Sequence, residues 1–175
     1  MNTYIQSILK GILIGSIAVF IASTVKAQAQ NVNLYDKEEY PQAYCMALNI
    51  YYEARGSNLA DRAATADVVW NRVKDTRYPN TVCEVVKQGL QDSNGNMIRN
   101  KCQFSWYCDG KNDNPQNEDL WVDAQLLAYQ MVHQDKYRGI TEGATHYHAT
   151  YVNPRWARSL QLVGRIGAHI FYRWE

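Results

Sequence analysis

Apolar residues recur with a helical period between residue 41 and about residue 139, and this pattern constrains the fold more than any other feature. In the first such stretch Ala43, Ala47, Ile50 and Ala54 follow one another at i, i+4, i+7 and i+11, the spacing of one helix face. Pro, Asn and Ser/Thr-x-x-Glu signals mark where helices begin, and Gly marks where they end. They predict a helix from Pro41 to Gly56, a second from Asn58 to before Tyr78, a short third between Thr81 and Gly89, and a long fourth from Glu118 to near Gly139.

The helical period is lost in the C-terminal part of the chain. Segments 144–151 and 169–174 are rich in aromatic residues and bounded by Gly and Pro, which is typical of short strands and turns. An Asn-Gly pair at 94–95 predicts a surface hairpin within residues 90–101. The sequence therefore predicts an α+β fold that is predominantly α-helical, with a small C-terminal strand region.

The first 29 residues have the composition of an export leader. Gly11–Val25 is an uncharged apolar run that is too short to span a bilayer comfortably, and Ala27-x-Ala29 offers the small residues that a signal peptidase accepts. We predict a signal peptide over 1–29, with an uncleaved N-terminal anchor as the alternative and the only expected membrane attachment. Residues 30–40 are then a linker and 41–175 the folded domain, located in the periplasm or outside the cell.

The charge balance argues against a nucleic-acid partner. The chain has 18 Lys and Arg against 17 Asp and Glu, a net charge of +1. The predicted leader contains two lysines and no acidic residue, so its removal gives 16 − 17 = −1. A protein that binds a polyanion usually carries a clear excess of basic residues, and none is present here.

Four cysteines, Cys45, Cys83, Cys102 and Cys108, lie in the predicted domain. In an exported protein an even number is most simply explained by two disulfides. Three connectivities are possible, and the sequence alone leaves the choice open. A catalytic cysteine remains a further alternative.

Glu53 is a candidate general acid because it lies near the end of the first predicted helix. The negative end of the helix dipole disfavours a carboxylate there, and burial in a groove lined by tyrosines would raise its pKa further. The positive charge of Arg55 would instead lower the pKa of Glu53. A solvent-exposed Glu53 paired with a nearby arginine is the alternative interpretation.

Four separated stretches together carry a family resemblance. They are Ala47–Gly56 (ALNIYYEARG), Val69–Val73 (VWNRV), Cys102–Ser105 (CQFS) and Ile166–Tyr172 (IGAHIFY). These stretches resemble the cell-wall hydrolase family that includes the spore cortex-lytic enzyme SleB. The resemblance implies a lysozyme-like body that cleaves peptidoglycan between N-acetylmuramic acid and N-acetylglucosamine, with Glu53 as the catalytic acid.

The number of catalytic carboxylates separates the two possible reactions. A glycoside hydrolase uses a second carboxylate, whereas a lytic transglycosylase can use one glutamate as acid and then base to form a 1,6-anhydro sugar. Asp61, Asp67 and Asp109 are candidates for a second group, but Asp61 fits a capping role and Asp67 a helix surface. We therefore expect the lytic transglycosylase mechanism, with no cofactor or metal and with a monomeric protein.

The expected substrate-binding residues come from three segments. Gln103 and Ser105 could bind sugar hydroxyl or N-acetyl groups, and aromatic faces could stack on pyranose rings. In the segment 145–149, Thr145, Tyr147 and Ala149 should share one strand face and the two histidines the other. The predicted set is Tyr52, Gln103, Ser105, His146, Tyr147, His148 and Trp156.

Three other functions remain as alternatives. His146, His148 and His169 could bind zinc in an amidase or peptidase, with Glu53 as base, although His169 fits internal packing better. A non-catalytic sugar-binding module and a cysteine-dependent amidase are the other two.

Overall fold

The computed structural model describes residues 36–175 of the chain. The predicted leader and residues 30–35 of the predicted linker lie outside the described residues. Within them, residues 36–39 form a turn in which Asp36 Oδ1 accepts the backbone N–H groups of Glu38 and Glu39. Tyr40 follows and packs edge-on against Tyr129 and His133, so the chain is anchored before the first helix begins.

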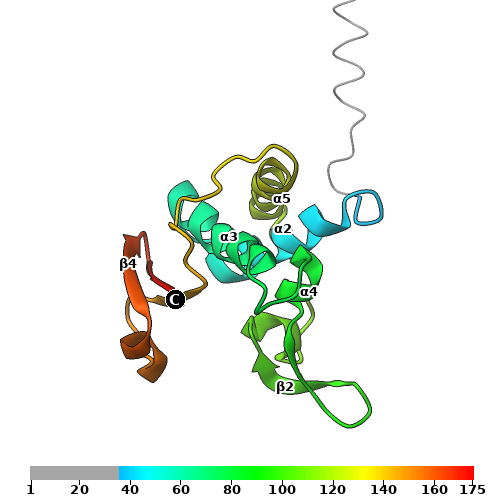
Figure 1. The fold of residues 1–175 in the computed structure, drawn as a ribbon. Helices are drawn as coiled ribbons and strands as arrows, with labels where there is room; N and C mark the ends of the chain where they lie inside the picture. Colours follow the sequence, from blue (N-terminus) through cyan, green and yellow to red (C-terminus); the bar gives the residue numbers. More distant parts are fainter. Residues whose placement is uncertain (1–35) are drawn as a thin grey trace, which may run out of the picture. The chain divides into compact units, whose positions relative to one another are not determined.

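Four helices form the body of the described domain: α2 (Pro41–Ala54), α3 (Leu59–Lys74), α4 (Val82–Val86) and α5 (Glu118–His133). Helix α2 contacts each of the other three, and Figure 1 shows it among them. Its buried residues Met46, Ala47 and Ile50 are fully enclosed by the main hydrophobic core. The apolar period of the sequence thus faces this core.

Local side-chain caps set where three of the helices begin. The Asn58 side chain accepts the Asp61 N–H at the start of α3, and the Asn117 side chain accepts the Leu120 N–H at the start of α5. At α4 the Thr81 hydroxyl accepts the Glu84 N–H and donates to the Glu84 carboxylate. These contacts satisfy N–H groups that have no partner within the helix, and they confirm the predicted starts.

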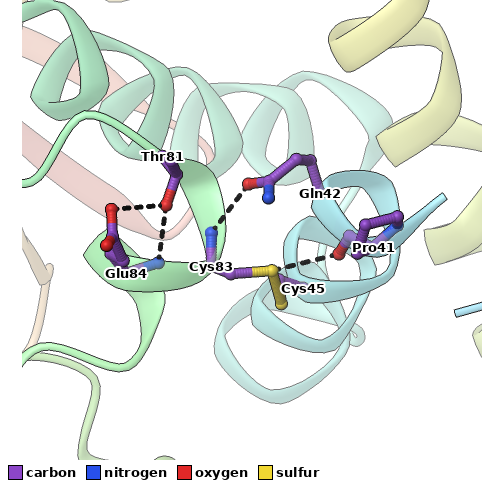
Figure 2. The surroundings of a disulfide bond; sticks show 6 residues. All are labelled: Pro41, Gln42, Cys45, Thr81, Cys83 and Glu84. Carbon is purple, nitrogen blue, oxygen red and sulfur yellow. Dashed lines mark hydrogen bonds between the residues drawn. A yellow bond between two sulfur atoms is a disulfide. The ribbon is translucent and has the colours of Figure 1, made fainter. Parts of the chain in front are cut away.

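A disulfide between Cys45 and Cys83 joins α2 to α4, with 5.2 Å between the two Cα atoms. Figure 2 shows the Gln42 side-chain oxygen accepting the Cys83 N–H beside it, at 3.1 Å. The bridge and this hydrogen bond hold the short helix α4, which has only five residues, against the side of α2.

The predicted hairpin is present as strands β1 (Gly89–Gln91) and β2 (Met97–Cys102). Its tip turns at Gly95, whose φ of +83° favours glycine. A second disulfide, Cys102–Cys108, joins the end of β2 to the 3-10 helix η1 (Ser105–Cys108). This bridge closes a short loop that contains Gln103 and Phe104.

The C-terminal sheet contains three antiparallel strands in the order β3-β5-β4. They are β3 (His146–Ala149), β4 (Gln161–Ile166) and β5 (His169–Arg173), and the 3-10 helix η2 (Arg155–Ser159) lies between β3 and β4 in sequence. Phe171 of β5 packs with Ala64 and Val68 in a second small core, so the sheet is docked on α3 (Figure 1). The predominantly helical α+β prediction is confirmed.

Two element predictions were wrong in their extent. Helix α5 ends at His133 and not near Gly139, because Asp135 adopts a positive φ of 55° and the Arg138 side chain caps the carbonyls of Met131 and Val132. Strand β4 lies between the two predicted C-terminal segments, where the sequence predicts no strand, and it continues through Gly164. Among the described residues, no helix combines the length and the apolar character needed to cross a membrane.

Candidate active site

Glu53 occupies the last turn of α2, one residue before the helix ends at Ala54. Its side chain is partly exposed, and its Oε2 atom accepts a 2.9 Å hydrogen bond from the Tyr147 hydroxyl. Burial is the largest influence on this carboxyl and raises its pKa above the ordinary value. The Tyr147 hydrogen bond and the charges of His169 and Arg72 act against this rise.

Tyr147 reaches Glu53 from the C-terminal sheet, 94 residues further along the chain. Its register partner on β5 is Phe171, and Ala149 pairs with His169, so these side chains share the sheet face that points toward Glu53. Burial beside the Glu53 carboxylate raises the pKa of Tyr147 well above its usual value. Tyr147 therefore stays a neutral hydrogen-bond donor.

The Tyr147 ring packs against His169, which is itself hydrogen-bonded to the buried Asp61. The His169 ring lies edge-on to the Tyr147 ring at 5.2 Å, and His169 Nδ1 lies 2.7 Å from Asp61 Oδ1. The other Asp61 oxygen accepts the Ala168 N–H. The expectation that His169 bonds internally is confirmed, and Asp61 links the start of α3 to β5.

A cavity of about 220 Å³ opens beside Glu53 and Tyr147. Of the predicted binding residues it brings together Gln103, His146, Tyr147 and Trp156. Burial, together with the positive charges of Arg72 and Arg77, lowers the pKa of His146 to about 4. His146 is therefore an uncharged ring at neutral pH. The full lining is Glu53, Arg72, Gln103, Phe104, His146, Tyr147 and Trp156.

Three predicted binding residues do not line this cavity. Ser105 is exposed at the start of η1, and His148 stacks on Tyr172 with its Nε2 atom 3.0 Å from the Tyr172 hydroxyl. Tyr52 stacks on the buried Trp106 ring at 4.9 Å, so this pair presents no free Trp106 face to a sugar. Tyr52 instead lines a second cavity of about 400 Å³.

Arg72 and Phe104 also line the cavity, although neither is among the residues predicted from the sequence. Phe104 is 3% exposed, as expected for core packing, yet it also forms part of the cavity wall. Arg72 is buried at 5% exposure and lines the same cavity. The available signal was its position three residues after Val69, which places a charge on the predicted apolar face of α3.

The three candidates for a second catalytic carboxylate do not line the cavity beside Glu53. Asp67 is fully buried rather than on a helix surface, and its oxygens accept the N–H groups of Gly139 and Thr141 and the Thr141 hydroxyl. Asp61 is bound to His169, and Asp109 forms an ion pair with Lys111. Among the residues that line the cavity, only Glu53 carries a carboxyl group.

The zinc and cysteine alternatives are contradicted by the geometry. His146 and His148 lie on the same face of the sheet, whereas His169 lies on the opposite face and is hydrogen-bonded to Asp61. The three imidazoles do not converge, and residues 36–175 contain no group of three or more side chains arranged to hold a metal ion. All four cysteines are in disulfides, so no thiol is free to act as a nucleophile.

Comparisons with known proteins agree on one family. A family model described as Cell Wall Hydrolase matches residues 56–172, more than half of the chain, and begins three residues after Glu53. The catalytic domain of the germination-specific lytic transglycosylase SleB from Bacillus anthracis superposes with a TM-score of 0.54 and 26% identity, covering 75% of this chain and 93% of that one.

The catalytic domain of the Bacillus cereus SleB protein gives a TM-score of 0.52, also with 26% identity, over 75% of this chain and 89% of that one. No curated protein sequence matches the chain significantly. The SleB-type resemblance and the lysozyme-like fold class are thereby confirmed.

Proposed function

Since this chain belongs to the Cell Wall Hydrolase family, and so is an enzyme that acts on peptidoglycan, we propose that it is a lytic transglycosylase. It cleaves the glycan strand between N-acetylmuramic acid and N-acetylglucosamine, with Glu53 as both general acid and general base. The SleB catalytic domain from Bacillus anthracis, which shares the fold, is itself described as a lytic transglycosylase.

The observation that carries the proposal is the setting of the Glu53 carboxyl. It lies at a cavity, burial raises its pKa, and its Oε2 atom is held by the Tyr147 hydroxyl. None of the hydrogen bonds in the described structure involves its Oε1 atom, which is left for the substrate. A carboxyl with a raised pKa retains its proton closer to neutral pH, as a general acid requires.

In the first step the Glu53 proton passes to the glycosidic oxygen. The bond between that oxygen and the muramic C1 breaks, and positive charge develops at C1. The N-acetylglucosamine leaves with a free 4-hydroxyl. As Glu53 becomes a carboxylate, the Tyr147 hydroxyl stabilises the new negative charge with a charge-assisted hydrogen bond.

In the second step the Glu53 carboxylate takes the proton of the muramic C6 hydroxyl, and O6 bonds to C1. The product is a 1,6-anhydro sugar, no water is consumed, and Glu53 regains its proton. A hydrolase would need a second carboxylate about 5–9.5 Å from the first. The cavity lining offers none, which supports the intramolecular route.

The rest of the cavity is suited to a sugar ring. Trp156 is 37% exposed and its ring lies 5.4 Å from the His146 ring, so the two form an uncharged aromatic wall. Such a wall binds the apolar face of a pyranose. Gln103 is exposed beside it and offers an amide for hydroxyl or N-acetyl groups.

Export of the enzyme is part of the proposal. Its substrate lies outside the cytoplasm, and two disulfides suit an oxidising compartment. The signal peptide over 1–29, the linker over 30–40 and the catalytic domain over 41–175 are proposed on the sequence grounds given above. We expect a monomer that needs no cofactor.

The test is mass spectrometry of the fragments released from purified peptidoglycan by the protein and by Glu53→Gln. We expect 1,6-anhydromuramic ends from the wild type and a loss of at least about a hundredfold in the variant, the scale of general acid catalysis. Reducing ends would mean a hydrolase. Unchanged turnover by a folded Glu53→Gln protein would overturn the proposal, as would release of free stem peptides alone.

A further inference from the structure

The buried guanidinium of Arg72 is not used by the proton transfers proposed above. Arg72 is 5% exposed and shares the cavity with Glu53. Its Nε atom donates to the Thr145 carbonyl at 2.7 Å, and its Cζ atom lies 5.2 Å from the Tyr78 ring centroid and 5.3 Å from that of Phe104. The group is therefore fixed in position before any ligand binds.

Arg72 lacks the carboxylate partner that a buried cation normally has. Its Nη1 atom is buried and has no hydrogen-bond partner, and among residues 36–175 no carboxylate lies within 4.0 Å of its guanidinium nitrogens. Buried charges are rare unless they are paired, because the lost hydration is not replaced. Arg72 thus brings to the cavity wall a positive charge that no carboxylate among residues 36–175 neutralises.

The charge of the cavity favours an anionic acceptor. When Glu53 carries the proton it will donate, its carboxyl is neutral. His146, with a pKa of about 4, and Tyr147, whose pKa is well above its usual value, are also neutral. Arg72 is then the one charged group among the lining residues. A guanidinium donates charge-assisted hydrogen bonds to a carboxylate, and these are stronger than hydrogen bonds between neutral groups.

We propose that Arg72 binds the free lactyl carboxylate of a muramic residue that carries no stem peptide. This inference rests on the proposed function. Arg72 and Glu53 share a cavity of only about 220 Å³, so the anion must belong to the sugar whose bond is cleaved. In a peptide-bearing strand the lactyl group is an amide and has no charge. The preferred substrate is therefore the product of amide hydrolysis that has removed the stem peptides.

The first test uses the unaltered protein, so it does not depend on a variant folding. Three glycan preparations are compared: strands with stem peptides, strands stripped by an amidase, and stripped strands whose lactyl carboxylates are capped as methylamides. We expect kcat/KM for stripped strands to exceed that for capped strands roughly ten- to hundredfold, the worth of a hydrogen bond to a charged group. Equal values, or a preference for peptide-bearing strands, would overturn the proposal.

Variants then assign the preference to Arg72. Arg72→Met should abolish the difference between stripped and capped strands, and Arg72→Lys should retain part of it because the charge remains without the planar fork. The matched control is Arg77→Met, since Arg77 is exposed yet its charge also reaches His146. The Arg77 variant should keep the full preference for stripped strands. An equal loss of that preference in both variants would mean that the overall positive charge near the cavity causes it, and would contradict a carboxylate bound to Arg72.

Binding separates this inference from the proposed reaction. Calorimetric titration of Glu53→Gln with stripped and capped tetrasaccharides should show tighter binding of the stripped form whatever the products of the wild type are. Anhydro products with no preference for the carboxylate in either assay would leave the proposed function standing and refute the role of Arg72. Absence of anhydro products from every substrate would refute the proposed function, and the titration would still decide the question for Arg72.

Discussion

Replacing Tyr147 by Phe removes one hydroxyl from the candidate site and keeps the ring that packs against His169 and Phe171. The lost O–H is the donor of the 2.9 Å hydrogen bond to Glu53 Oε2. In the proposed mechanism Glu53 becomes a carboxylate as it gives up its proton, so this bond is worth more after proton transfer than before it. We therefore expect a lower kcat with little change in stability or substrate binding.

The size of the loss follows from the chemistry of the bond. A hydrogen bond to a charged group contributes about 1.5–3 kcal/mol, and each 1.36 kcal/mol is a factor of about ten in rate. The kcat of Tyr147→Phe should fall roughly ten- to hundredfold. The hydrogen bond also lowers the pKa of Glu53 against the effect of burial, so that pKa should rise in the variant.

The assay is the release of anhydromuramic ends measured from about pH 4 to about pH 9. The alkaline limb of the profile reports loss of the acidic proton, and in Tyr147→Phe it should move to higher pH while the maximum falls. Tyr151→Phe is the matched control, since Tyr151 is 88% exposed. An unchanged kcat, or an alkaline limb displaced to lower pH, would refute the assigned contact.

Three further results are expected. Burial raises the pKa of Glu53, so the stabilising effect of this residue is complete below its unfolded pKa and is lost as the pH rises through the folded value. Glu53→Gln should therefore raise Tm at neutral pH but not below about pH 4. Thermal melts that show an equal shift of Tm at both pH values would contradict this. The ring resonances of His146 should titrate in NMR spectra at about pH 4; a midpoint near the ordinary value would refute its buried, uncharged state. Cys102→Ser/Cys108→Ser should lower the free energy of unfolding by about 2 kcal/mol in denaturant titrations and raise KM, because two cavity-lining residues lie inside the loop that this disulfide closes. A normal KM would contradict that positioning role.

The helix ends nearest the candidate acid could be predicted because their causes are local. Pro41, the apolar spacing of α2 and the glycine after it lie within one stretch of sequence, and they place Glu53 in the last turn. The cap at Asn58 is equally local. Such signals act over three or four residues, so they can be recognised without knowing what the helix packs against.

The contacts that could not be predicted join distant parts of the chain. Asp67 resembled a surface residue because its partners, Gly139 and Thr141, lie more than 70 residues away. The early end of α5 depends on Arg138 returning to cap it. Arg72 could be recognised as a charge on an apolar face, but its cavity and its unpaired Nη1 atom became evident only from the packing.

The hydrogen bond between Glu53 and Tyr147 has a consequence for how the enzyme becomes active. Its two ends belong to the first described helix and to a strand 94 residues later, so the contact closes a long loop and forms only after the sheet has docked on α3. During synthesis the helices emerge first, and Glu53 stays without its partner until the C-terminal sheet has been made. Any partial opening that frees the sheet would likewise break this contact while the helical body stays folded. If Glu53 is the acid proposed above, turnover is therefore a sensitive probe of whether the C-terminal sheet is docked on α3.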